Sequence, residues 1–102
     1  MPDVDPRLCR TTVRIGGVSH PADVLDLSGH AATFRSSLAL SDGAILRICL
    51  HWEGGATTLL RSTVSTVSSD PGCDPVTHAR VLGVEGDWRP FLAHVGAAVA
   101  SR

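Results

Sequence analysis

The sequence predicts a small all-β fold, a barrel or sandwich of about six short strands followed by one C-terminal helix. Three observations predict it. Apolar and polar residues alternate with a period of two, turn residues separate these segments at short spacing, and a helical period appears only near the C-terminus. With 102 residues, 43% of them hydrophobic, the chain is long enough for a single domain, residues 1–102, with one modest core.

The clearest strand covers residues 44–52. One of its faces is apolar throughout and the other carries Arg47 and His51, which is typical of a half-buried strand. A glycine turn follows, and residues 57–68, rich in threonine, valine and leucine, then complete a hairpin. The apolar face consists of Ala44, Leu46, Ile48, Leu50 and Trp52.

Four further segments have strand character, and turn residues separate them. Gly16-Gly17 and Pro21 part the first two, and Ser41-Asp42-Gly43 precedes the long strand. A loop rich in proline and aspartate precedes the last one. The predicted strands are residues 11–15, 22–28, 31–36 and 76–85.

The helical period predicts a helix over residues 87–100. Asp87 is a suitable N-cap, and Pro90 falls in the first turn, where a missing N–H costs little. Apolar residues then recur on one stripe, which we expect to pack on the strands. The stripe consists of Trp88, Phe91, Leu92, Val95 and Val99.

Composition and charge argue against several functional classes. The net charge of −1 argues against a nucleic-acid-binding protein, although all nine basic residues are arginine. No apolar run approaches the ~20 residues that span a bilayer, so we expect no membrane insertion. The N-terminus carries acid and proline rather than an export signal, and three cysteines without CxxC spacing fit the cytoplasm.

No known catalytic motif is present. The five histidines and three cysteines lack zinc-ligand spacing, and neither a GxSxG elbow nor a phosphate-binding glycine loop occurs. We therefore expect no enzyme, no metal and no cofactor.

Two constellations could bind a ligand. Arg7, Arg10 and Arg14 cluster near the N-terminus, and an arginine fork grips a phosphate bidentately or contacts the edge of a guanine. Asp26 and Ser28 end the second predicted strand, where a carboxylate could accept the N–H groups of a guanine.

Strand alternation predicts how the second constellation is oriented. Asp26 and Ser28 should share the outward face, and Leu25 and Leu27 should point into the core.

At these residues the chain resembles the PilZ domain family, whose members are bacterial receptors for cyclic di-GMP. The family has an RxxxR motif in an N-terminal arm, matched here by Arg10 and Arg14, and a (D/N)xSxxG motif that ends a barrel strand. Asp26 and Ser28 match the second motif, and Ala31 stands at its glycine position, where a methyl group would add strain or approach the ligand.

The resemblance implies a six-stranded antiparallel β-barrel with one C-terminal helix. It also implies a non-enzymatic cyclic di-GMP receptor or adaptor that acts on a partner protein. Residues 1–10 would form a flexible arm that the ligand orders, with Arg10 and either Arg7 or Arg14 on the phosphates and Asp26 and Ser28 on a guanine. The alternative is a degenerate family member that binds no nucleotide and acts through protein–protein contacts.

Overall fold

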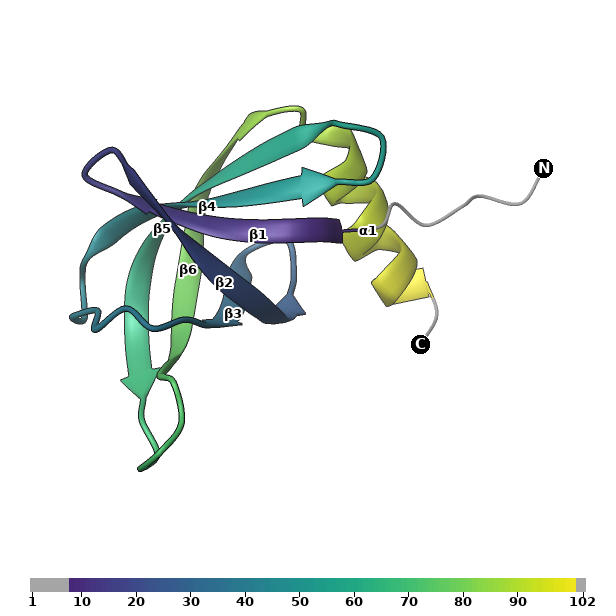
Figure 1. Ribbon diagram of the computed structural model, residues 1–102. Coiled ribbons are helices and arrows are strands. Elements are labelled where there is room, and N and C mark those ends of the chain that lie inside the picture. Colours follow the sequence, from purple (N-terminus) through teal and green to yellow (C-terminus); the bar gives the residue numbers. More distant parts are fainter. Residues whose placement is uncertain (1–7, 101–102) are drawn as a thin grey trace.

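Six antiparallel strands close into a barrel in this computed structural model, in the spatial order β1-β2-β3-β6-β5-β4, and one helix follows (Figure 1). This confirms the six-stranded barrel with a C-terminal helix. The structure describes residues 8–100. The strands are β1 (Leu8–Ile15), β2 (Val18–Leu27), β3 (Ala31–Arg35), β4 (Ile45–Trp52), β5 (Thr57–Ser68) and β6 (Val76–Gly86), and the helix is α1 (Arg89–Ala100).

The first strand differs from its prediction at the N-terminal end. β1 begins at Leu8, which pairs with Trp52 of β4, and Arg10 pairs with His51. Arg10 therefore lies in the sheet, and the predicted arm of residues 1–10 is wrong for its last three positions. The rest of that arm, with Arg7, lies outside the described residues.

The second strand runs through the predicted break at Pro21. β2 begins at Val18, directly after the Gly16-Gly17 turn, and Pro21 pairs with Thr12 of β1. Pairing with β3 starts only at Asp23. Pro21 therefore has no partner on that side, and its lack of an N–H costs no hydrogen bond to β3.

The barrel interior contains the apolar face predicted for the long strand. Leu46, Ile48, Leu50 and Trp52 of β4 are buried, and Ala44 packs against them from the preceding turn. All five remaining strands contribute side chains to this core, among them Val13, Leu27, Phe34, Leu60, Val64 and Ala79.

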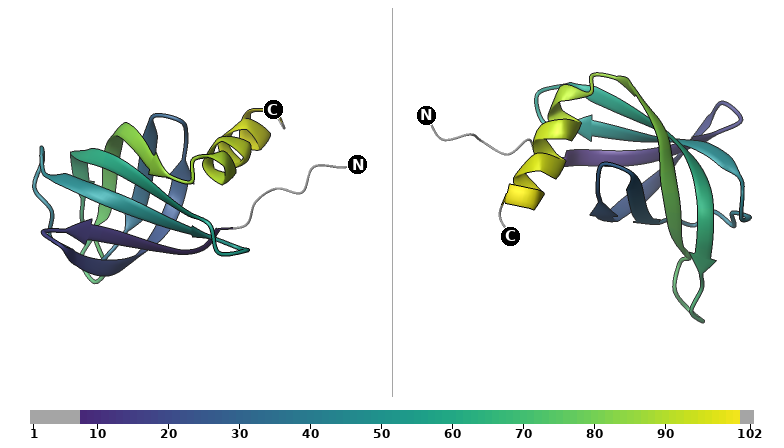
Figure 2. Two further views of the ribbon diagram at one scale, coloured as in Figure 1. Left: turned by 90° about the horizontal axis from the view of Figure 1, so that it is seen from above. Right: turned by 180° about the vertical axis from the view of Figure 1, so that it is seen from behind.

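Helix α1 lies across the end of the barrel where β1 begins (Figure 2). Phe91 is 1% exposed and Val95 packs against the core, as the stripe predicted. Trp88 and Leu92, by contrast, are 54% and 50% exposed, so the prediction that they pack on the barrel is wrong. The side chain of Val99 lies outside the described part of the helix.

Asp87 holds the start of the helix, as predicted. Its carboxylate accepts the backbone N–H of Arg89 over 3.2 Å and forms an ion pair with the Arg89 guanidinium over 3.1 Å. The hydrogen bond from the Arg89 side chain lowers the pKa of the Asp87 carboxyl below its usual value.

Candidate ligand-binding surface

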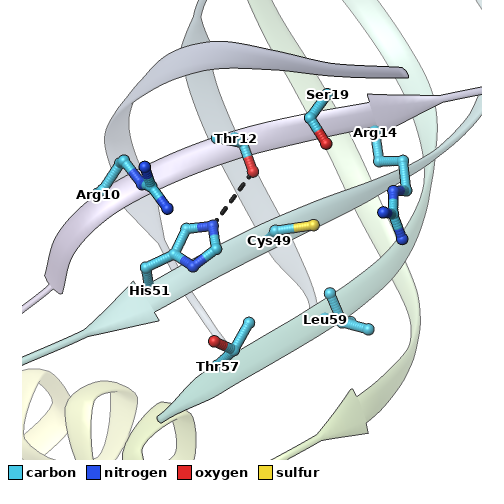
Figure 3. A pocket seen from close by; sticks show the side chains of 8 residues that line it. All are labelled: Arg10, Thr12, Arg14, Ser19, Cys49, His51, Thr57 and Leu59. Carbon is cyan, nitrogen blue, oxygen red and sulfur yellow. Dashed lines mark hydrogen bonds between the residues drawn. The ribbon is translucent and has the colours of Figure 1, made fainter. Parts of the chain in front are cut away.

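The predicted arginines of β1 lie on the outer surface of the barrel. Thr11 and Val13 point inward and are buried, so Arg10, Thr12 and Arg14 share the outer face. Arg10 and Arg14 are about 13 Å apart along the strand, at about 3.3 Å per residue. Both line a shallow groove of ≈ 350 Å³, together with Thr12, Ser19, Cys49, His51, Thr57 and Leu59 (Figure 3).

His51 lies in this groove between Arg10 and Thr12. Its Nε2 lies 3.3 Å from the Thr12 hydroxyl, across the β1–β4 pair (Figure 3). Burial of the ring, and to a smaller extent the positive charge of Arg10, lowers the pKa of His51 below its ordinary value of 6.5. His51 is therefore protonated less readily than a free imidazole, and Arg10 and Arg14 are the cationic side chains that line the groove.

Asp26 is exposed at the end of β2, as predicted, but its neighbours are arranged differently. Leu27 is buried, whereas Leu25 is 49% exposed, so the prediction that Leu25 points into the core is wrong. A register shift between Val24 and Asp26 in the pairing with β3 explains the difference. This β-bulge adds one residue to β2, so Leu25 and Asp26 both face outward.

Ser28 closes the turn between β2 and β3. Its backbone N–H donates to the Ala31 carbonyl over 2.8 Å, and its hydroxyl accepts the Ala31 N–H over 3.1 Å and lies 3.3 Å from the same carbonyl. The Ser28 hydroxyl, which was predicted to bind a guanine, is therefore already hydrogen-bonded within the turn.

The strain expected at Ala31 does not occur. Every described residue with a positive φ is a glycine, so Ala31 has an ordinary backbone conformation. Ala31 is exposed and pairs in register with Arg80 of β6. Of the two effects expected of alanine at this position, backbone strain is therefore absent, and only the methyl group could hinder the approach of a ligand.

The structure separates Arg14 from the aspartate motif and brings Arg10 closer to it. Arg14 pairs with Ser19 of β2, and Asp26 lies seven residues farther along that strand, about 23 Å away. Arg10 instead lines a second groove of ≈ 200 Å³ with Asp23, only about 10 Å along β2 from Asp26. Of the two possible partners of Arg10, Arg14 is thus too far from Asp26 to share a compact ligand with it.

Sequence reasoning missed two residues beside Arg10, namely His51 and Asp23. His51 was placed correctly on the polar face of its strand, but only the β1–β4 register shows that it faces Arg10. Asp23 was missed because Pro21 suggested that the strand had barely begun there. Both assignments needed pairing between strands, which a pattern within one strand does not contain.

The described part of the chain offers little for other chemistry. Within residues 8–100, no group of three or more histidine, cysteine, aspartate or glutamate side chains is placed to hold a metal ion. No helix in that part of the chain combines the length and the apolarity needed to cross a membrane. Searches against protein-family models, curated proteins and solved structures find no match to this chain.

Proposed function

We propose that this protein is a non-enzymatic receptor for cyclic di-GMP, which binds on the outer surface where β1 begins and β2 ends. One observation carries the proposal. Arg10 and Asp23 line one groove, and the exposed Asp26 follows three residues later on the same strand. Figure 1 shows that β2 ends at the end of the barrel where β1 begins.

Each side chain has a distinct role in this proposal. Arg10 holds a phosphate of the ligand with its guanidinium fork, assisted by Arg7. Asp26 accepts the N1–H and N2–H of a guanine, and the exposed Leu25 beside it offers an apolar surface for the base. Ser28 contributes indirectly, since its hydrogen bonds to Ala31 fix the turn that follows Asp26.

Isothermal titration with cyclic di-GMP at stated salt tests the proposal. Arg10→Gln and Asp26→Asn should each weaken binding by about 1.5–3 kcal/mol, or roughly ten- to a hundredfold, because each removes a charge-assisted hydrogen bond. Asp26→Asn should also reduce the preference for cyclic di-GMP over cyclic di-AMP. Arg61→Gln, an exposed arginine of β5, is the matched control and should bind as the wild type does.

The second candidate function is an adaptor that acts only through protein contacts. The exposed Trp88 and Leu92 favour it, because these large apolar side chains lie one helical turn apart, Trp88 directly before α1 and Leu92 in its first turn. Absence of heat from the wild type and from Ala31→Gly alike, at high cyclic di-GMP concentration, would favour this adaptor over the receptor.

A further inference from the structure

Three arginines form a row across the outer surface, at the end of the barrel opposite Asp26. Arg14 of β1 pairs directly with Arg47 of β4, and Arg47 pairs directly with Arg61 of β5. All three side chains are exposed. With neighbouring strands about 4.8 Å apart, the row spans about 10 Å.

This arrangement is unfavourable in the protein alone. Like charges directly opposite each other on adjacent strands destabilise a sheet. Glu85 offsets one of the three charges, since the Nε of Arg47 donates to its Oε2 over 3.1 Å. Arg14 and Arg61 form no ion pair with any of the described residues. The row therefore keeps an excess of about two positive charges.

The row also lines a groove. Arg14, Arg47 and Arg61 surround a space of ≈ 280 Å³, which Gly16 and Gly17 of the β1–β2 turn border on another side. The space beside these two glycines is open, so a ligand can approach the backbone there. The guanidinium of Arg61 extends over Gly83 of β6, where the absence of a side chain leaves room for it.

We propose that the arginine row is a second, independent anion site, which binds a small ligand carrying a chain of two or more phosphate groups. Adjacent guanidinium forks match adjacent phosphates, each of which accepts paired hydrogen bonds. The groove is small, and only the phosphate chain needs to enter it. The protein's net charge of −1 gives no general attraction for nucleic acid. Binding of the phosphates therefore depends on the arginines of the row.

Titration with inorganic tripolyphosphate at low salt tests this site. Binding should be one to one and should weaken as salt is added. Arg61→Gln should weaken it about tenfold or more, because one charge-assisted contact is lost. Arg35→Gln, an exposed arginine of β3 outside the row, is the matched control and should have no effect.

A second variant gives a change of opposite sign. Glu85→Gln removes the carboxylate that competes for Arg47, so tripolyphosphate should bind more tightly than to the wild type. This gain does not depend on whether Arg61→Gln folds well. GTP and UTP added in parallel distinguish the sources: affinities equal to that of tripolyphosphate mean that only the phosphate chain is read, and a preference for one nucleotide means that its base is also held.

The result that overturns the site is also clear. No binding of tripolyphosphate at millimolar concentration excludes it, and so does an equal loss in Arg35→Gln and Arg61→Gln, which would indicate nonspecific attraction. Failure of this site leaves the cyclic di-GMP proposal untouched, because Arg61→Gln is expected to retain cyclic di-GMP binding and Asp26→Asn to retain tripolyphosphate binding.

Discussion

The indole N–H of Trp52 donates to the Thr58 hydroxyl over 2.8 Å within the core. Thr58 donates its own proton to the Asp87 carbonyl, so two residues of the β4–β5 hairpin are linked to the segment that starts α1. The Trp52 ring also lies against His94 of the helix, with ring centroids 5.4 Å apart. Orientation of the helix on the barrel therefore depends on a polar chain as well as on apolar packing.

Thr58→Val should destabilise the protein by about 1–3 kcal/mol. The substitution keeps the shape of the side chain but leaves the buried Trp52 N–H and the Asp87 carbonyl without their partner. Chemical denaturation measures the loss. Thr57→Val, at a half-buried neighbouring position, should change the unfolding free energy much less.

Thr77→Val should have the opposite outcome to Thr58→Val. Thr77 is equally buried, but its hydroxyl has no hydrogen-bond partner within the described residues. Removing an unsatisfied buried hydroxyl is expected to be neutral or stabilising. A loss of more than about 1 kcal/mol in the same denaturation experiment would mean that the hydroxyl is bonded in solution.

Phe91→Ala should destabilise the protein by about 3–5 kcal/mol, because it leaves a cavity between the helix and the barrel. Leu92→Ala is the matched control, one residue away on the exposed side of α1, and should change stability by no more than about 0.5 kcal/mol. Similar melting temperatures for the two variants would contradict the way in which the helix is docked.

Gly86→Ala should cost at least about 1–2 kcal/mol, since Gly86 has a φ of 73° that disfavours any side chain. An added Cβ would also lie 2.8 Å from the Thr57 carbonyl oxygen, which belongs to the backbone and cannot rotate away. Gly29→Ala, where φ is not positive and nothing lies within 4 Å, should be tolerated. Thermal unfolding of the two variants provides the comparison.

The pKa of His51 should rise in Arg10→Gln, because the nearby positive charge is removed, and stay unchanged in Arg35→Gln. An NMR titration of the imidazole measures it. A phosphate bound at Arg10 should raise the same pKa, which offers an independent readout of ligand binding.

The lowered pKa of His51 also determines how the stability of the protein changes with pH. The unfolded state takes up a proton at His51 more readily than the folded state, so this residue lowers stability as the pH falls below 6.5. His51→Gln should reduce that dependence, and an unchanged pH profile of the unfolding free energy would contradict the assignment.

The sequence predicted the strands well because most of them obey a strict two-residue period. The alternation from Leu46 to Trp52 follows directly from one buried face, and the structure confirms it. The orientation of Leu25 could not be predicted in this way, because a bulge adds one residue to β2 between Val24 and Asp26. The alternation of inward and outward side chains is interrupted at this extra residue. Likewise, the helical stripe identified α1 but not how little of it the barrel covers, since Trp88 and Leu92 belong to the same stripe as Phe91.

The candidate sites show the same limit. Arg10 and Asp26 were singled out from the sequence, and they do lie toward one end of the outer surface. The row of Arg14, Arg47 and Arg61 was not foreseen, because its members are far apart in the chain and meet only through the register of three strands. Side chains that converge within one strand can be predicted from alternation, whereas those that converge between strands require the topology.

The closure of the barrel limits how this protein can meet another one. Each of the six strands is hydrogen-bonded to a neighbour on both sides over part of its length, so unpaired main chain is confined to short stretches of the described residues, such as residues 82–86 of β6 beyond the pairing with β3. An extended peptide therefore has little main chain to pair with, and a partner mainly meets side chains on the outer surface or on α1. Selectivity would then depend mainly on charge and shape, and a ligand that neutralises surface arginines would directly change what such a partner encounters.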